Sequence, residues 1–293
     1  MPRELKNCPA PAKLNLFLHI IGRRADGYHL LQSVFQLIDR CDYLDFTVRS
    51  DGIIERANQV AGVPAELDLV VRAAQLLQKH SQSSYGATIT LHKNLPMGGG
   101  VGGGSSDAAT TLLALNHLWN CQLSTTELMQ LGLQLGADVP FFIFGSNAFV
   151  EGIGEQLQEV QTPEQYFLVI EPGVNVPTPS IFSAKELTRD TKAVRITDFP
   201  DATTVAWKND MQAVACTLHS EIKEAIDWLS QFQQESGNLR LASAKMTGSG
   251  SCVFCGFETE KQANEVCTQV PKHWKAWVAK ALQQHPMKSW LQN

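Results

Sequence analysis

Apolar and polar residues alternate near the start of the chain. Within residues 13–20, every position of one parity is apolar: Leu14, Leu16, Leu18 and Ile20. A period of two is typical of a β-strand with one buried face. The pattern therefore predicts a strand in which Lys13 and Asn15 point to the same side, away from the most apolar face. A turn at residues 25–27 and two further apolar stretches indicate a β-rich opening.

Farther along, apolar residues recur at spacings of three and four, which predicts amphipathic helices over 66–79 and 211–232. Weaker signals predict additional helices over 105–119, from a cap at Ser124 to Gly136, and over 259–269, and strands over 87–91, 166–170, 251–257 and 276–282. Helices and strands that mix without strict βαβ alternation indicate an α+β fold. Polar residues and a proline interrupt the pattern near 159–164, so we expect two domains, 1–160 and 161–293.

Composition narrows the class of protein. Of 293 residues, 44% are apolar and 18% are charged, as in ordinary globular chains. A net charge of −5 argues against nucleic acid as a partner, because phosphates favour clustered Lys and Arg. Among seven cysteines, only Cys252 and Cys255 are spaced like metal ligands, and no second pair follows. We expect reduced thiols, a cytoplasmic location, no signal peptide and no membrane segment.

The most unusual segment is glycine-rich, with six glycines in the seven positions 98–104. Glycine loses the most backbone entropy on folding, so such a run must serve special backbone geometry or close approach to a ligand. Its bare N–H groups, followed by a helix N-terminus, are typical of a polyphosphate site. We therefore expect a phosphate-binding loop that consists of Pro96, Met97, Gly98, Gly99, Gly100, Val101, Gly102, Gly103, Gly104, Ser105 and Ser106.

Three other interpretations of this loop are weaker. A Walker A loop requires a lysine after its last glycine, but Ser105 follows Gly104. A dinucleotide fingerprint needs a second strand that ends in an acidic residue about twenty residues later, where this sequence predicts a loop and a helix start. A flexible linker would lack the flanking strand and helix. Asp107 is expected in the first turn of the following helix, where a favourable interaction with the helix dipole is preferred over a magnesium contact.

Two charged residues elsewhere in the sequence are candidates for catalysis together with this loop. Asp138 lies on a turn between Gly136 and Pro140, where it is equally a candidate N-cap. Lys13 opens the first strand, and an exposed strand-end lysine is the commoner case. Together with the loop they complete a phosphotransfer site, in which a carboxylate accepts a hydroxyl proton and an ammonium stabilises the developing alkoxide.

Four separated motifs occur in the order of a known family: residues 11–16, 96–106, 135–140 and 247–250. On these motifs the sequence resembles the GHMP kinase superfamily over nearly its whole length. The resemblance implies an N-terminal domain like ribosomal protein S5 domain 2 and a ferredoxin-like C-terminal domain. The stretches 22–29 and 177–182 are similar to members that use ATP and Mg²⁺ to phosphorylate the 2-hydroxyl of a cytidine-diphosphate-linked methylerythritol, in the non-mevalonate route to isoprenoids.

The resemblance also implies roles for individual residues. Lys13 and Asp138 match the catalytic pair, and the glycine loop matches the ATP site. Five residues match substrate contacts, the aromatic ring of the tyrosine stacking on cytosine: Asn15, Tyr28, His29, Thr178 and Phe182. The sequence departs from the family at Asp68, where an asparagine near adenine is frequent, so recognition of adenine by this side chain is in doubt.

Two rival functions remain at this point. The first is another GHMP kinase, of the homoserine or mevalonate type, against which Tyr28, His29 and the segment 177–179 argue. Inhibition by cytidine diphosphate would distinguish the two. The second is a nucleotide-binding module without catalysis, against which Lys13 and Asp138 argue. ATP turnover that depends on an added alcohol would decide that question.

Overall fold

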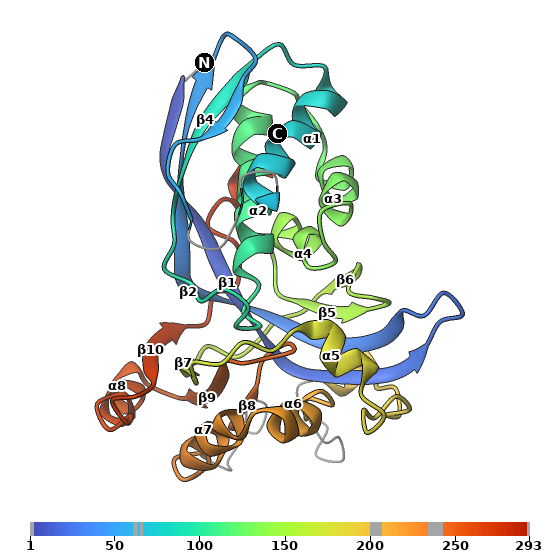
Figure 1. The fold of residues 1–293 in the computed structure, drawn as a ribbon, viewed down its shortest axis with the longest axis vertical. Coiled ribbons are helices and arrows are strands. Elements are labelled where there is room, and N and C mark those ends of the chain that lie inside the picture. Colours follow the sequence, from blue (N-terminus) through green and yellow to red (C-terminus); the bar gives the residue numbers. More distant parts are fainter. Residues whose placement is uncertain (1–2, 61–63, 65–66, 200–206, 234–242, 292–293) are drawn as a thin grey trace.

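A long antiparallel hairpin organises the chain. In the computed structural model, which describes residues 3–60, 64, 67–199, 207–233 and 243–291, strand β1 (Glu4–Arg23) pairs with β2 (His29–Arg49). Figure 1 shows this hairpin running past both halves of the molecule. It is interrupted by register shifts, one of them between Asn15 and Leu18. Such irregularities bend a strand and change the direction of its side chains.

The first sheet has six strands in the order β3-β4-β2-β5-β6, with β1 on β2. The pairs are antiparallel except β3 with β4. Four helices cover one face of this sheet (Figure 1). The bounds are β3 (Ile54–Arg56), β4 (Gly86–His92), β5 (Ala148–Glu151), β6 (Gln156–Glu159), α1 (Leu69–Ser81), α2 (Gly103–Leu118), α3 (Thr125–Leu133) and α4 (Val139–Phe144).

The second sheet is antiparallel and has four strands, in the order β10-β7-β9-β8. Helices α7 and α8 pack against it, and a short helix, α5, leads back toward the first sheet (Figure 1). The bounds are β7 (Tyr166–Glu171), α5 (Thr178–Ser183), α6 (Gln212–Leu218), α7 (Ser220–Ser230), β8 (Lys245–Met246), β9 (Val253–Phe257), α8 (Glu260–Cys267) and β10 (Lys275–Lys280); two 3₁₀ turns cover Ile196–Asp198 and Lys288–Leu291.

The α+β class is confirmed, and most elements fall where the periodicity predicts them. The cap at Ser124 is also confirmed, because its hydroxyl accepts from Glu127 N–H in a capping box. The single helix predicted over 211–232 is wrong. It breaks into α6 and α7 at His219, whose φ of −140° and ψ of 103° are extended. The domain boundary near 160 stays a prediction, supported by the end of the first sheet at Glu159.

The prediction that β1 has a single buried face is wrong. Both parities are buried, and Lys13 and Asn15 are 3% and 1% exposed. The helices of the first sheet cover one side of the hairpin, while Leu14 and Leu16 share a cluster with Phe167 of the second sheet. In a strand that lies between two cores, both faces are buried, even where apolar and polar residues alternate in the sequence. Within the described residues, no helix is both long and apolar enough to cross a membrane.

Candidate active site

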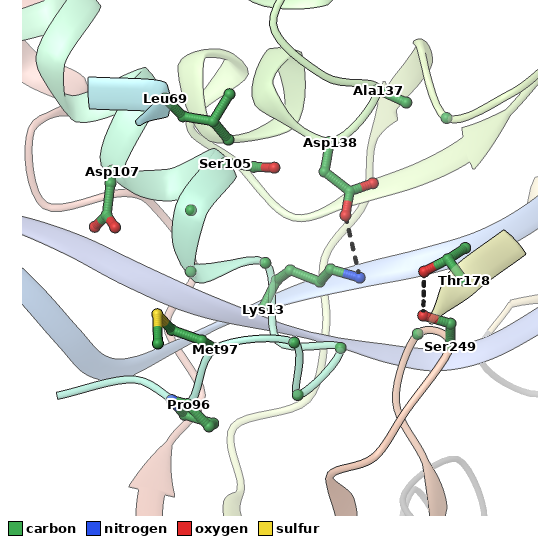
Figure 2. Close-up of a pocket in the computed structure, with 18 of the residues that line it drawn as sticks. Lys13, Leu69, Pro96, Met97, Ser105, Asp107, Ala137, Asp138, Thr178 and Ser249 are labelled. Atoms are coloured by element: carbon green, nitrogen blue, oxygen red, sulfur yellow. Dashed lines mark hydrogen bonds and ion pairs between the residues drawn. The ribbon is translucent and has the colours of Figure 1, made fainter. Parts of the chain in front are cut away.

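A cavity of about 600 Å³ opens where the two sheets meet. Figure 2 shows its wall, to which β1, the glycine loop, the start of α4, the start of α5 and the turn at 248–249 all contribute. Segments from both ends of the chain therefore surround one space. Three of the lining side chains carry the charges and hydroxyls expected of a phosphotransfer site: Lys13, Asp138 and Ser105.

The glycine loop adopts the geometry that its composition predicts. Gly98, Gly100 and Gly102 have φ of 70°, 75° and 75°, a region that side chains other than glycine disfavour. Gly102 then serves as the N-cap of α2, so that helix begins at Gly103, two residues earlier than expected. The first turn of a sixteen-residue helix thus starts in the cavity wall, and its free N–H groups favour an anion there.

The loop also touches a second turn from the other half of the molecule. A Cβ on Gly100 would lie 2.2 Å from the Thr247 carbonyl oxygen, and one on Gly248 would lie 2.8 Å from the Gly100 carbonyl oxygen. The two backbones are therefore in direct contact. Nine of the eleven predicted loop residues line the cavity, but Val101 and Ser106 do not. These two are buried, and the Val101 carbonyl accepts from the Lys13 backbone N–H at 2.9 Å.

Lys13 and Asp138 face each other across the cavity (Figure 2), with Nζ and Oδ2 3.6 Å apart. The lysine side chain is 4% exposed and the aspartate side chain 34% exposed. Burial lowers the pKa of Lys13 below its usual value, and the nearby Asp138 carboxylate opposes that shift. Nζ also lies 4.6 Å from the centre of the Phe35 ring, a cation–π distance.

The alternative role of Asp138 as a helix cap is not realised. Asp138 occupies the N-cap position of α4, but its side chain makes no capping hydrogen bond and its backbone is αR. A capping residue normally has extended backbone and accepts from an N–H of the first turn. Its carboxylate is instead directed at Lys13. Pro140, in the first turn of α4, has no N–H group, so one fewer backbone donor needs a cap.

Asn15 lies beside Lys13 on the same strand and lines the cavity, although it is 1% exposed. Its Oδ1 accepts from Lys13 Nζ at 2.5 Å. Its backbone N–H donates to Thr247 Oγ1 at 3.0 Å, across 232 residues of sequence. Asn15 is thus tied to the lysine and to the second turn at the same time. Its expected contact with substrate stays a prediction.

The other expected substrate residues lie on α5 and at the turn between β1 and β2. Thr178 and Phe182 line the cavity, and Thr178 Oγ1 lies 2.7 Å from Ser249 Oγ (Figure 2). His29 stacks on Phe182, with ring centres 4.6 Å apart and an interplanar angle of 15°. Tyr28 is 60% exposed, and neither it nor His29 is among the lining residues.

Arg189 is a residue that the sequence did not single out. Its guanidinium donates to three backbone carbonyls around α5, including that of Phe182 at 3.0 Å, and its Nε donates to His29 Nε2 at 3.1 Å. Burial, Arg189 and Arg23 together lower the pKa of His29. The imidazole is therefore neutral with its proton on Nδ1, since Nε2 is the acceptor. No motif or periodicity in the sequence analysis pointed to this residue.

A buried charge cluster lies beside the end of the glycine loop, where Lys93 Nζ would be 3.3 Å from a Cβ on Gly103. Lys93 Nζ lies 2.5 Å from Asp42 Oδ2 and 3.0 Å from Asp107 Oδ2, and Asp42 Oδ1 accepts from the N–H groups of Asn94 and Leu95 at 2.5 and 2.8 Å. Burial raises the pKa of Asp107 to about 7, against the opposing effect of Lys93. The expectation that Asp107 lies in the first helical turn is wrong, because α2 starts earlier.

Asp68 is committed to the protein. One oxygen accepts from Val70 N–H at 2.8 Å and caps α1, and the other pairs with Arg56. Both side chains of that ion pair are nearly buried, at 6% and 5% exposure, and both residues line the cavity. The carboxylate therefore performs the capping role that an asparagine would also perform. Its second oxygen is held by a guanidinium.

Comparison with known proteins adds a family to this geometry. The model of the GHMP kinases N terminal domain matches residues 68–146, and that of the GHMP kinases C terminal matches residues 191–276. The first match contains the glycine loop and Asp138. The second contains the 247–250 turn that contacts the loop. The two matches therefore meet at the cavity.

Full-length relatives agree. The chain is 64% identical to the 4-diphosphocytidyl-2-C-methyl-D-erythritol kinase of Janthinobacterium sp. (strain Marseille) and 63% identical to that of Herminiimonas arsenicoxydans, in each case over 98% of both chains. Among solved structures, a 4-(cytidine 5'-diphospho)-2C-methyl-D-erythritol kinase superposes with a TM-score of 0.77 at 30% identity, covering 95% of this chain and 98% of the other.

Proposed function

Because the chain belongs to the GHMP kinases, and within them to the family of the 4-diphosphocytidyl-2-C-methyl-D-erythritol kinases, we propose that it transfers the γ-phosphate of ATP to the 2-hydroxyl of 4-(cytidine 5'-diphospho)-2-C-methyl-D-erythritol. The observation that carries this proposal is the Lys13–Asp138 pair, 3.6 Å apart, in the same cavity as the glycine loop. An acid–base pair and a polyphosphate cradle are the two parts that phosphoryl transfer to an alcohol requires.

Asp138 is the proposed general base. Its carboxylate makes no helix-capping hydrogen bond, is partly exposed and is directed at the cavity. It is therefore available to accept the proton of the substrate hydroxyl. Lys13 lies close enough to orient that carboxylate and to stabilise the substrate oxygen as negative charge develops on it. Burial of the lysine strengthens both effects, because charges interact more strongly where water is excluded.

The polyphosphate of ATP is proposed to bind the loop formed by Pro96 to Ser106. The positive φ angles at three glycines and the start of α2 present backbone N–H groups to it. The lining side chains contain neither His nor Cys, and a hard oxygen donor such as the Ser105 hydroxyl fits Mg²⁺. We propose that Ser105 holds the ion together with the phosphates, where it would neutralise the charge of the transferring group. Among the described residues no cluster forms an all-protein cage.

The cytidine end of the substrate is proposed to lie against α5 and the hairpin. Phe182 is held parallel to His29, and the neutral His29 has its proton on Nδ1 for a cytosine acceptor. Tyr28, which is largely exposed beside it, is free to cover the base on binding. Thr178 and Asn15 complete the proposed contacts. An aromatic face and a single donor in this position would favour a pyrimidine nucleotide.

The proposed setting is the cytoplasm, with small molecules and not nucleic acid as partners. All seven cysteines are free thiols, and four of them are buried. This supports a reducing compartment. The overall charge of −5 supports the absence of a nucleic-acid surface.

The test is release of ADP from magnesium-ATP in the presence of the cytidine-linked alcohol. Asp138→Asn should lower kcat by about 10²–10⁴-fold, the usual contribution of a general base. Asp227→Asn is the matched control, because Asp227 is an exposed member of an i,i+4 pair on α7. Cytidine diphosphate should inhibit competitively. Turnover of homoserine or mevalonate, with none of the cytidine-linked alcohol, would overturn the substrate assignment.

A further inference from the structure

A serine outside the cavity controls the direction in which Asn15 presents its amide to Lys13. Ser33 lies on β2, is fully buried and is absent from the cavity lining. Its Oγ lies 2.5 Å from the Phe17 carbonyl oxygen and 2.9 Å from Asn15 Nδ2. We propose that Ser33 is a positioning residue for phosphoryl transfer, acting on Lys13 through Asn15.

The irregularity of the hairpin creates this arrangement. The register of β1 on β2 shifts between Asn15 and Leu18, so the regular ladder is interrupted there. The Phe17 carbonyl, which lies inside this interruption, accepts from the Ser33 hydroxyl. A buried carbonyl needs such a partner, because an unpaired acceptor in a site without water is unfavourable. The serine hydroxyl is thereby fixed as a donor to the backbone.

The order of donors and acceptors then runs in one direction. A carbonyl oxygen can only accept, so the Ser33 hydroxyl must donate its single hydrogen to the Phe17 carbonyl. Its oxygen can then only accept from Asn15, which requires Nδ2 of the amide to face Ser33. Oδ1 is left facing Lys13, whose ammonium only donates. Thr247 Oγ1, which accepts from the Asn15 backbone, donates at 3.3 Å to the same Oδ1 or to Gly100.

Removal of the Ser33 hydroxyl interrupts this chain of hydrogen bonds at its first donor. In Ser33→Ala, the Asn15 Nδ2 group and the Phe17 carbonyl both lose their partner in a fully buried site. The amide then loses the acceptor that fixes its Nδ2 side, so Oδ1 is held toward Lys13 less firmly and the ammonium loses a well-positioned acceptor. The protonated form of Lys13 would lose an acceptor, which lowers its pKa further. The ammonium would also move relative to Asp138.

The inference rests on the proposed phosphoryl transfer, so its test includes wild type and Asp138→Asn. With both substrates, Ser33→Ala should lose about 10–100-fold in kcat, the scale of a displacement near 1 Å, with KM values close to wild type. The alkaline limb of its kcat profile should move to lower pH. Ser33→Thr, which keeps the hydroxyl, should restore both. A purely structural serine would not move the pH limb.

Thr162→Val is the matched control. Thr162 Oγ1 also accepts from a buried amide, that of Asn147, at 2.8 Å, but it lies outside the cavity lining. Its kcat and pH limb should equal those of wild type. If Ser33→Ala does not fold, Ser33→Cys keeps the volume with a weak donor and should show the same losses in smaller degree.

The outcomes separate the two proposals. An inactive wild type would remove the proposed function and leave Ser33 without a reaction to support. An active wild type with an inactive Asp138→Asn, but with wild-type kcat and pH limb in folded Ser33→Ala or Ser33→Cys, would overturn the positioning role alone. A drop in kcat without a shift of the alkaline limb would overturn the route through Lys13.

Discussion

The contact between the glycine loop and the 247–250 turn predicts a severe defect from one added methyl group. In Gly100→Ala the new Cβ would lie 2.2 Å from the Thr247 carbonyl oxygen and 3.1 Å from Gly250 N and O. Ordinary carbon–oxygen contacts lie at about 3.3 Å or more. Since both partners are backbone, the two turns must separate by about 1 Å, which is enough to cost about 10²-fold in rate.

A second cost comes from the backbone. Gly100 has φ of 75°, where a residue with a Cβ loses about 1–2 kcal/mol. Gly173→Ala isolates this term, because Gly173 has φ of 85° and nothing within 4 Å of the position of its Cβ. Both variants should therefore lose stability, roughly 2–4 °C in Tm per kcal/mol, and Gly100→Ala should lose more because of its contact with Thr247. Only Gly100→Ala should also lose about 10²-fold in kcat/KM.

The assay is steady-state ADP release combined with thermal unfolding of both variants. Equal kcat/KM for Gly100→Ala and Gly173→Ala would refute the reasoning, because it would mean that the two turns accommodate the methyl group without disturbing the site. A large drop in both variants would refute it as well. In that case the effect would follow from general destabilisation and not from the contact with Thr247.

Three further predictions concern groups around the site. Asp68→Asn keeps the cap of α1 but removes the buried negative charge that pairs with Arg56. The free energy of unfolding should therefore fall by about 3 kcal/mol in urea titrations, and an unchanged midpoint would contradict this. Burial lowers the pKa of His285 to about 4. The unfolded chain binds that proton near pH 6.5, so stability is present above 6.5 and should fall by about 3 kcal/mol as the pH falls to 4, a loss that His285→Gln should remove and that equal pH slopes would disprove. Arg189→Ala should raise KM for the cytidine substrate about tenfold with little change in kcat, since it frees His29 and α5; a selective loss of kcat would assign Arg189 to the chemistry.

The features that the sequence predicted well are those with a local cause. Six glycines in seven positions demand special backbone geometry wherever they occur, and positive φ values at Gly98, Gly100 and Gly102 meet that demand. The cap at Ser124 depends on a side chain and a backbone group three residues apart. Asp138 stood out because a proline follows shortly after it. None of these signals needs knowledge of distant segments.

The features that the sequence missed depend on long-range packing. Nothing local tells that both faces of β1 are covered, because the second cover is supplied by strands more than a hundred residues later. The helix break at His219 follows neither a proline nor a glycine. The pairing of Lys93 with Asp42 and Asp107 joins residues 51 and 14 positions away. Periodicity carries no information about such partners.

The bond between Asn15 and Thr247 has a consequence for synthesis of the chain. Translation proceeds at about 5–20 residues per second, so the 232 residues between them take roughly 10–50 s to emerge. Throughout that interval the second cover of Leu14 and Leu16 is incomplete, and part of the apolar face of β1 is open to wrong partners. Until the last fifth of the chain has been synthesised, β1 is therefore covered mainly by the first sheet and its helices. Only then does Thr247 reach Asn15 and complete the site.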